Sequence, residues 1–117
     1  MTDIRRLHAG ARMSQAVIHG DLVYTAGQVA QDNAGASVAV QTTEVLARID
    51  ALLAEAGTDK SRILSANLYL ADITNFDEMN SVWDNWVVRG ATPARTTVEA
   101  RLAGSEYGIE IGVIAAI

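Results

Sequence analysis

The chain reads Pro93-Ala94-Arg95-Thr96-Thr97-Val98-Glu99 near its C-terminal end. The β-branched residues in this stretch favour an extended strand, which we expect from about residue 95 to residue 102. Arg95, at the start of the strand, is always charged and presents a rigid fork of N–H groups that fits a planar carboxylate. The stretch therefore predicts a strand that could bind a small acid, with an ordinary salt bridge to a neighbouring glutamate as the alternative.

A second apolar stretch, residues 109–117, follows after a turn of small residues at 103–105. Strand alternation places Ile109 on one face of the sheet and Glu110 and Ile114 on the other. The second face is then half apolar, which suits neither a core nor a solvated surface. We therefore expect a homo-oligomer that covers it.

The two closing strands also predict where the charged side chains gather. We assume that the apolar side chains of the first strand share a face with Ile109, as in a hairpin. The opposite face then collects charges and hydroxyls, namely Arg95, Thr97, Glu99, Arg101 and Glu110. Two interpretations remain open from the residues alone. One is a structural network of Glu99, Arg101 and Glu110, and the other gives Arg95 an anionic ligand and Glu110 a water molecule.

Hydrophobic periodicity predicts the remaining elements. They are a hairpin of residues 15–18 and 22–25, a helix from Ser37 to Gly57, a half-buried strand at 64–70, and a helix from 74 or 75 to Gly90. The order β-β-α-β-α-β-β is typical of an α+β sandwich, in which two helices pack on one face of a mainly antiparallel sheet.

The composition sets limits on the class of protein. The 117 residues are 50% hydrophobic and 20% charged, which predicts a single globular domain spanning residues 1–117. The absence of cysteine excludes disulfides, thiolate zinc sites and a cysteine nucleophile. His8 and His19 lack metal-ligand spacing, so we expect no metal.

Charge and hydropathy limit the partners. The net charge of −5 argues against a nucleic-acid partner, because non-specific binding to phosphates depends on Lys and Arg. The N-terminus has no apolar segment typical of a signal peptide, and no apolar stretch approaches the roughly 20 residues that span a bilayer. We therefore expect a cytoplasmic protein with no membrane partner.

Several segments, taken in order, resemble the RidA/YjgF family over nearly the whole chain. They are residues 14–17, 20–28, Gln41, 76–80, 93–99 and 109–111. The Pro-Ala-Arg element of 93–99 and the Gly-Gln element of 20–28 are fairly specific together. The resemblance implies a chorismate-mutase-like α+β fold and a homotrimer whose sheets form a central barrel with three clefts between subunits.

The resemblance also implies an activity. Family members of the deaminase type hydrolyse reactive imines and enamines of 2-keto acids to the keto acid and ammonia, without a cofactor of their own. Arg95 matches the arginine that binds the substrate carboxylate, and Glu110 matches the glutamate that positions water and handles the proton of the leaving amine. Gly27 and Asn80 match positions that line the cleft.

Two cleft positions depart from the family pattern. Met13 stands where a tyrosine is common, and Thr97 stands where a cysteine is common. Thr97 keeps a hydroxyl, whereas Met13 lacks the phenol that could orient substrate or water. The leading hypothesis is an imine deaminase, and the alternative is a trimeric module that binds a small carboxylate without turnover. A third hypothesis, an endoribonuclease, is disfavoured by the acidic composition.

Overall fold

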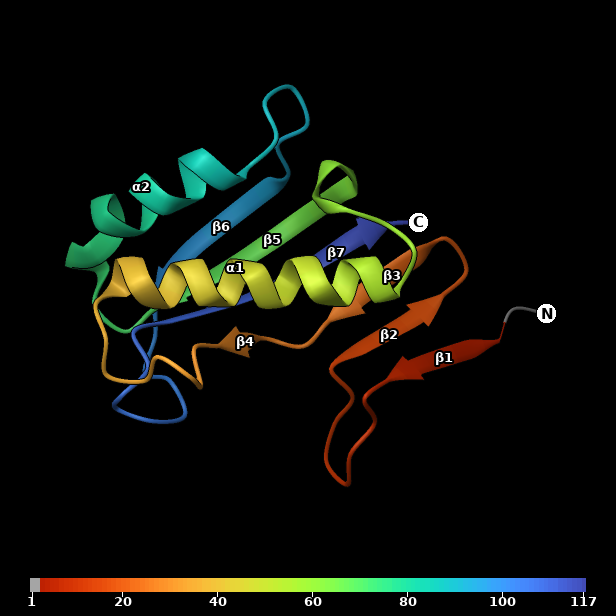
Figure 1. Cartoon of the computed structure of the whole chain (residues 1–117), viewed down its shortest axis with the longest axis horizontal. Helices are drawn as coiled ribbons and strands as arrows, with labels where there is room; N and C mark the ends of the chain where they lie inside the picture. The colour runs from red at the N-terminus through yellow and green to blue at the C-terminus, as the bar shows by residue number, and fades with distance from the viewer. Residues whose placement is uncertain (1–2) are drawn as a thin grey trace.

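The computed structural model describes residues 3–117. The elements are β1 (Ile4–Leu7), β2 (Ala16–His19), β3 (Leu22–Thr25), β4 (Gln28–Val29), α1 (Val38–Glu55), the 3-10 turn η1 (Lys60–Arg62), β5 (Ile63–Leu70), the 3-10 turn η2 (Ile73–Asn75), α2 (Phe76–Trp86), β6 (Ala94–Glu99) and β7 (Ile109–Ala116). Figure 1 shows α1 crossing in front of the strands with α2 beside it. The predicted arrangement of two helices on one face of a mainly antiparallel sheet is confirmed.

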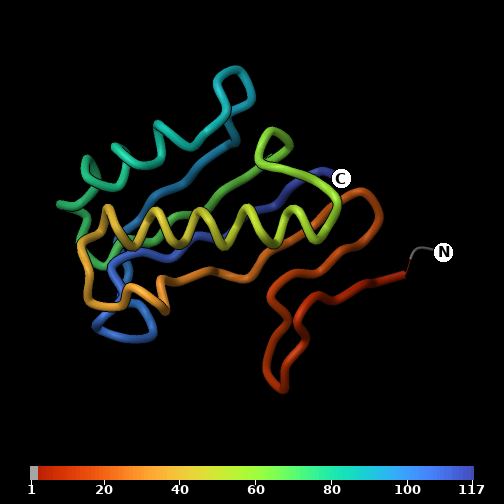
Figure 2. Tube along the Cα trace, viewed as in Figure 1, coloured from red at the N-terminus to blue at the C-terminus, as the bar shows by residue number. Residues whose placement is uncertain are grey.

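The strands form one sheet in the order β1-β2-β3-β7-β5-β6, and β4 also pairs with β7. Every pairing is antiparallel except that of β5 with β6. The exception arises because α2 connects these two strands as a crossover, and a crossover connection returns the chain in the same direction. The β1–β2 connection extends away from the helices (Figure 2).

The hydrophobic core lies between the helices and the sheet. Val45, Ile49 and Leu53 of α1 are fully buried, as are Leu68 of β5 and Ile111 of β7. Fully burying a side chain of this size contributes roughly 1.5–3 kcal/mol. The same face of the sheet therefore carries most of the apolar burial and holds the strands in place. No helix formed by residues 3–117 has the length and apolar character needed to cross a membrane.

The expected pairing of the two closing strands is wrong. β5 lies between β6 and β7, and its register aligns Ala66 with Arg95 and Leu68 with Thr97. Aligned residues of paired strands share a face, and Ala66 and Leu68 are buried beneath the helices. Arg95 and Thr97 therefore lie on the helix-covered face together with Ile111, not opposite it.

Glu110 lies on the other side of the sheet. It aligns with Tyr69 of β5, and both are partly exposed on the face that no helix covers. The expected common face for Arg95 and Glu110 is thus contradicted within one chain. The error came from assuming a hairpin across residues 100–108, where the chain passes over the end of β5 instead.

α1 begins and ends where the sequence predicts. The Ser37 hydroxyl accepts a hydrogen bond from the Val40 N–H at 3.3 Å, and Gly57 follows the helix at φ +86°, which favours glycine. In the helical pattern Gln41 shares a polar stripe with Glu44 and Arg48, which predicts an exposed side chain, but Gln41 is buried. Its amide donates to the Glu106 carbonyl at 3.0 Å and accepts from the Gly108 N–H at 2.8 Å, so it fixes the start of β7.

α2 is shorter than expected and ends at Trp86 rather than near Gly90. Asn75 and Glu78 have the spacing of a capping box, which predicts one at the start of this helix, but Asn75 makes no side-chain cap hydrogen bond. Glu78 instead accepts a hydrogen bond from the Ala39 N–H at 2.8 Å, which ties the start of α2 to the start of α1. The acidic residue thus serves the helix-to-helix contact rather than its own helix end.

Three strand features departed from the sequence pattern. β1 was missed because Arg5 and Arg6 interrupt its apolar residues, and β4 was missed because it has only 2 residues. Leu64, expected in the core, is 51% exposed because the pairing register shifts between Ile63 and Ser65. The bulge buries Ile63 in its place and turns Leu64 outward.

The Glu44 carboxylate of α1 gives a stability prediction. Burial raises its pKa, but hydrogen bonds from Asn33 and Arg48 and from the Asp32 N–H outweigh that effect and hold the pKa below 4.5. The ionised form thus stabilises the fold above pH 4.5, and this contribution is lost as the pH falls through the native pKa. We expect Glu44→Gln to lower the free energy of unfolding by about 1 kcal/mol at pH 7.

Urea unfolding at several pH values measures this effect. The difference between wild type and Glu44→Gln should narrow below about pH 4.5. Asp84→Asn removes an exposed carboxylate of α2 and serves as the control, with little change expected at any pH. A difference that is constant with pH would show that the charge of Glu44 is not the cause.

Candidate functional site

The guanidinium of Arg95 is held by three side chains of α2. Its Nη1 donates a hydrogen bond to Asn80 Oδ1 at 2.7 Å. Its central carbon lies over the Trp83 ring at 5.1 Å from the centroid and over the Phe76 ring at 5.7 Å. Phe76, Asn80 and Trp83 are spaced i, i+4 and i+7, which places them on one face of the helix above β6.

Arg95 has no carboxylate partner in the part of the chain that the structure describes. The neighbouring Glu99 instead accepts a hydrogen bond from the Ile73 N–H at 3.1 Å. The alternative of an ordinary salt bridge is therefore not met, and no ion pair among residues 3–117 joins Glu99, Arg101 and Glu110. A partly buried cation without a counter-ion is unfavourable unless a ligand or partner supplies the negative charge.

Thr97 lies two residues beyond Arg95 on the same face of β6. Its Oγ1 atom is buried and has no hydrogen-bond partner among the described residues. Buried hydroxyls are nearly always hydrogen-bonded, so an unpaired one needs an explanation. The hydroxyl lies on the same strand face as Arg95, and the described residues do not use its hydrogen-bonding capacity.

Glu110 belongs to a different site on the open face. Its carboxylate packs against Gly27, where a Cβ atom would overlap it. Gly112 lies beside the same segment, where a Cβ would make ordinary contact at 3.7 Å from the Gly27 backbone. Within the described chain the carboxylate accepts no hydrogen bond from a protein donor. It faces a groove of about 280 Å³ that Tyr24 and Asn67 also line.

Met13, in the β1–β2 connection, lines a cavity that Glu110 also lines. This smaller cavity, of about 250 Å³, is lined by Gly27 and by Arg48 of α1 as well. The Met13 side chain is exposed. Gln28, also in the lining, is buried and donates to Gln15 Oε1 at 2.9 Å, which fixes the backbone beside Gly27.

The expected site residues therefore fall into two groups. The cation half-site consists of Arg95, Asn80 and Thr97, and the carboxylate half-site consists of Glu110, Gly27 and Met13. The two lie on opposite faces of the sheet, with β5 between their strands. A single chain thus cannot place both groups on one small molecule.

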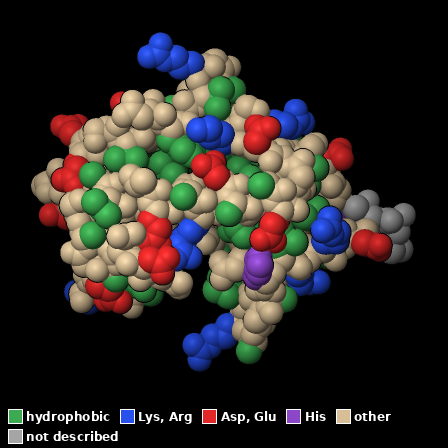
Figure 3. All heavy atoms as spheres, viewed as in Figure 1, with side chains coloured by type: hydrophobic (Ala, Val, Ile, Leu, Met, Phe, Trp, Pro, Cys, Tyr) green, Lys and Arg blue, Asp and Glu red, His purple; other side chains and the backbone are tan. Residues whose placement is uncertain are grey.

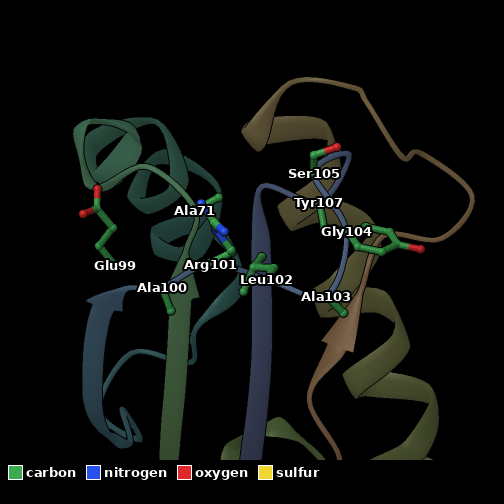
Figure 4. A pocket seen from close by; sticks show the side chains of 9 residues that line it. All are labelled: Ala71, Glu99, Ala100, Arg101, Leu102, Ala103, Gly104, Ser105 and Tyr107. Carbon is green, nitrogen blue, oxygen red and sulfur yellow. The ribbon is translucent and has the colours of Figure 1, made fainter.

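A further cavity is not part of either half-site. It measures about 730 Å³ at the end of β6 and is lined by Glu99, Arg101, Tyr107 and the small residues between them. Figure 4 shows the Glu99 carboxylate and the Tyr107 hydroxyl pointing away from one another. Because its polar groups diverge, this cavity does not assemble the few convergent groups typical of a small-molecule site.

Sequence reasoning missed Phe76 and Trp83 as site residues. Both aromatics lie on the apolar face of the helical pattern of residues 74–90, which predicts the core; this is correct for Trp83 at 5% exposure but wrong for Phe76 at 38%. The i, i+4, i+7 spacing around Asn80 was the available signal. This spacing could be linked to Arg95 only once the register of β6 was known, because that register puts Arg95 on the helix side of the sheet.

The fold and the two half-sites define a class of protein: a two-helix α+β domain with an unpaired arginine and an unpaired glutamate on opposite sheet faces. The family described as Endoribonuclease L-PSP matches residues 3–117. The chain belongs to this family, which is also called RidA/YjgF or RutC. The prediction of the family from the sequence is confirmed.

Known relatives match the chain at nearly full length. A RutC family protein of Haemophilus influenzae is 44% identical over 112 residues, which cover 96% of this chain and 97% of the relative. The RutC family protein YoaB of Escherichia coli K12 is 44% identical over 114 residues, covering 97% and 98%. The crystal structure of NMB1025, a YjgF family member from Neisseria meningitidis, has a TM-score of 0.94 and 46% identity, covering 97% and 94%.

The close approach of Gly27 to Glu110 gives a further prediction. A methyl group at residue 27 would overlap the Glu110 carboxylate, so Gly27→Ala should displace that side chain. We expect at least about a tenfold loss of any activity that depends on Glu110, because misplacing a catalytic group by about 1 Å costs up to 100-fold. Gly10→Ala is the control for effects of an added methyl group, because Gly10 does not have a positive φ and a Cβ there would lie in ordinary contact, 3.4 Å from the Met13 carbonyl oxygen. A crystal structure with Glu110 unmoved would contradict the explanation.

Proposed function

We propose that the chain is a hydrolytic deaminase of reactive 2-imino and 2-enamino acids, which it converts to 2-keto acids and ammonia. The observation that carries the proposal is the partly buried guanidinium of Arg95, which has no carboxylate partner in residues 3–117 and lies beside the unpaired Thr97 hydroxyl. Together they offer a fixed positive charge and hydrogen-bond donors to a planar carboxylate. The chain belongs to the RidA/YjgF family, and its resemblance to the deaminase-type members of that family implies the same function.

We further propose that the functional unit is a homotrimer with clefts between subunits. The cation half-site and the carboxylate half-site lie on opposite faces of one sheet, so a shared substrate requires two copies of the chain. The open face also exposes Tyr24 and Val98, which are 42% exposed, and Leu64 at 51%. Apolar side chains on an uncovered sheet face favour burial against another subunit.

An imine carbon is already activated toward attack by water, so the reaction needs only a positioned substrate and one group that transfers protons. Arg95 and Thr97 of one copy hold the carboxylate, which fixes the position of the neighbouring imine carbon. Glu110 of the next copy accepts a proton from water as its oxygen bonds to that carbon, and returns the proton to the nitrogen. In the resulting carbinolamine, Glu110 takes the hydroxyl proton and delivers it to the nitrogen as the C–N bond breaks and the C=O bond forms, so the products are the keto acid and ammonia.

An imine-trapping assay tests the activity. An amino-acid dehydratase or oxidase generates the imine in place, semicarbazide captures what remains, and the protein should reduce semicarbazone formation. Short aliphatic, branched and aromatic imines are compared. If none disappears faster than in buffer, the enzyme proposal is lost. Calorimetric binding of 2-keto acids without turnover would then support the small-carboxylate binding module, which the replacement of tyrosine by Met13 favours.

An RNA-cleavage assay covers the third hypothesis, since the family description names an endoribonuclease. The net charge is −5, and on the helix-covered face the Lys and Arg side chains are scattered among acidic ones (Figure 3). This distribution does not favour binding to a phosphate backbone. RNA cleavage by a nuclease-free preparation that persists in Arg95→Ala would point to a separate activity.

A further inference from the structure

We propose that Phe76 and Trp83 form an aromatic clamp that positions Arg95 for the substrate carboxylate. The identity of that ligand rests on the function proposed above. The clamp itself rests on the contacts of the guanidinium, which lies 5.1 Å from the Trp83 centroid and 5.7 Å from the Phe76 centroid. Both distances are within the roughly 6 Å range of a cation–π attraction.

The clamp stabilises the charge of Arg95 without occupying its N–H groups. A carboxylate beside Arg95 would stabilise the cation, but it would also occupy the N–H groups that a substrate needs. An aromatic face attracts the cation through the electrons of its ring and uses none of those N–H groups. Asn80 takes a single hydrogen bond from Nη1, and the described residues accept no other bond from this guanidinium. The guanidinium of Arg95 is thus fixed in position, and its remaining N–H groups stay free to bind a ligand.

The two rings contribute differently to positioning. Trp83 is 5% exposed and packs on Trp86 with ring centroids 5.3 Å apart, so it is a fixed wall. Phe76 is 38% exposed and lies in the first turn of α2, at the solvent side of the guanidinium. Holding a flexible arginine in advance lowers the entropy lost when a ligand binds. Loss of a ring should therefore weaken ligand binding more than it slows the chemical step.

Phe76→Leu tests the clamp, because leucine keeps an apolar side chain but removes the aromatic face. We expect KM for the imine, and Kd for a 2-keto acid measured by calorimetry, to rise by about 3- to 20-fold, with kcat changed less than about twofold. Phe76→Tyr retains the ring and should stay within about twofold of wild type. Lys60→Met is the matched control: it removes a different cation–π contact of α2, that of Lys60 with Trp86 at 5.3 Å, without changing either ring of the clamp, and should leave KM unchanged.

A second measurement does not depend on turnover. Nitrogen-15 NMR of arginine side chains reports rotation of the guanidinium, and Arg95 should give restricted signals in wild type that become averaged in Phe76→Leu. If KM, Kd and these signals are all unchanged in Phe76→Leu, the clamp is refuted. If wild type neither hydrolyses imines nor binds keto acids, the proposed function fails, and the NMR comparison alone still decides the clamp.

Discussion

Arg95→Ala is expected to abolish most imine hydrolysis while leaving the protein folded. Truncating one partner of a buried, hydrogen-bonded charge pair costs about 2–5 kcal/mol, which corresponds to roughly a 30- to 5000-fold loss of kcat/KM. Stability should change far less, because in the described chain the guanidinium makes a single hydrogen bond, to Asn80, and no ion pair. The substitution therefore separates the binding role from a structural one.

Arg95→Lys refines this test. Lysine keeps the positive charge but lacks the planar fork, and it cannot present two parallel N–H groups to a carboxylate. We expect an intermediate loss, roughly 10- to 100-fold, carried mainly by KM. Imine hydrolysis is measured by semicarbazide trapping, and stability by urea unfolding. Arg101→Ala, an exposed arginine in the loop after β6, is the control for loss of one charge.

Two outcomes would contradict this assignment. If Arg95→Ala hydrolyses imines as well as Arg101→Ala does, the substrate carboxylate is bound elsewhere. If Arg95→Ala unfolds in the absence of urea, the residue is structural, and the conservative Arg95→Lys then decides whether the charge or the fork matters.

The order and type of the main elements could be predicted because their signals are local. Ser37 and Gly57 mark the ends of α1 through a side-chain cap and a positive φ, and both depend on a few neighbouring residues. Alternation in β7 correctly placed Ile109 and Ile111 in the core, with Glu110 on the opposite face. The family was recognisable for the same reason, since its motifs are short segments in a fixed order.

The strand order could not be predicted in the same way. Nothing in residues 93–99 shows that β6 pairs with β5 in parallel rather than with β7 as a hairpin, because that choice is made by the packing of α2 over the sheet. Because β6 was expected to pair with β7 rather than β5, Arg95 and Thr97 were predicted on the wrong face of the sheet. The residues proposed for the site were thus named from the sequence, but their division into two half-sites required the register.

That division leads to the prediction that distinguishes a shared site most directly. Glu110→Gln keeps the shape of the side chain but removes the base, and general acid–base groups contribute about 100- to 10,000-fold. Arg95→Ala and Glu110→Gln should therefore both be nearly inactive alone. Mixed in one oligomer, however, the two variants should restore each other, because the Arg95 variant still supplies Glu110 and the Glu110 variant still supplies Arg95.

The expected recovery can be estimated. In a randomly assembled 1:1 mixture, a site between two copies receives an intact Arg95 from one and an intact Glu110 from the other in about one case in four, so about a quarter of wild-type activity should return. In isolated trimers that contain both variants, one site in three is intact, so about a third of wild-type activity should return. The variants are co-expressed with different tags, or unfolded and refolded together, and mixed oligomers are isolated through both tags. Light scattering gives the number of subunits, and semicarbazide trapping gives the activity.

Matched mixtures make the result specific. Arg95→Ala mixed with the double variant Arg95→Ala/Glu110→Gln should remain inactive, because no copy supplies an intact arginine. The two single variants combined only after assembly should also remain inactive, unless their subunits exchange. Isolated mixed oligomers that recover no activity would show that the site does not draw Arg95 and Glu110 from different copies. Since the sheet of one chain keeps these two residues on opposite faces, that result would also remove Glu110 from the reaction at Arg95.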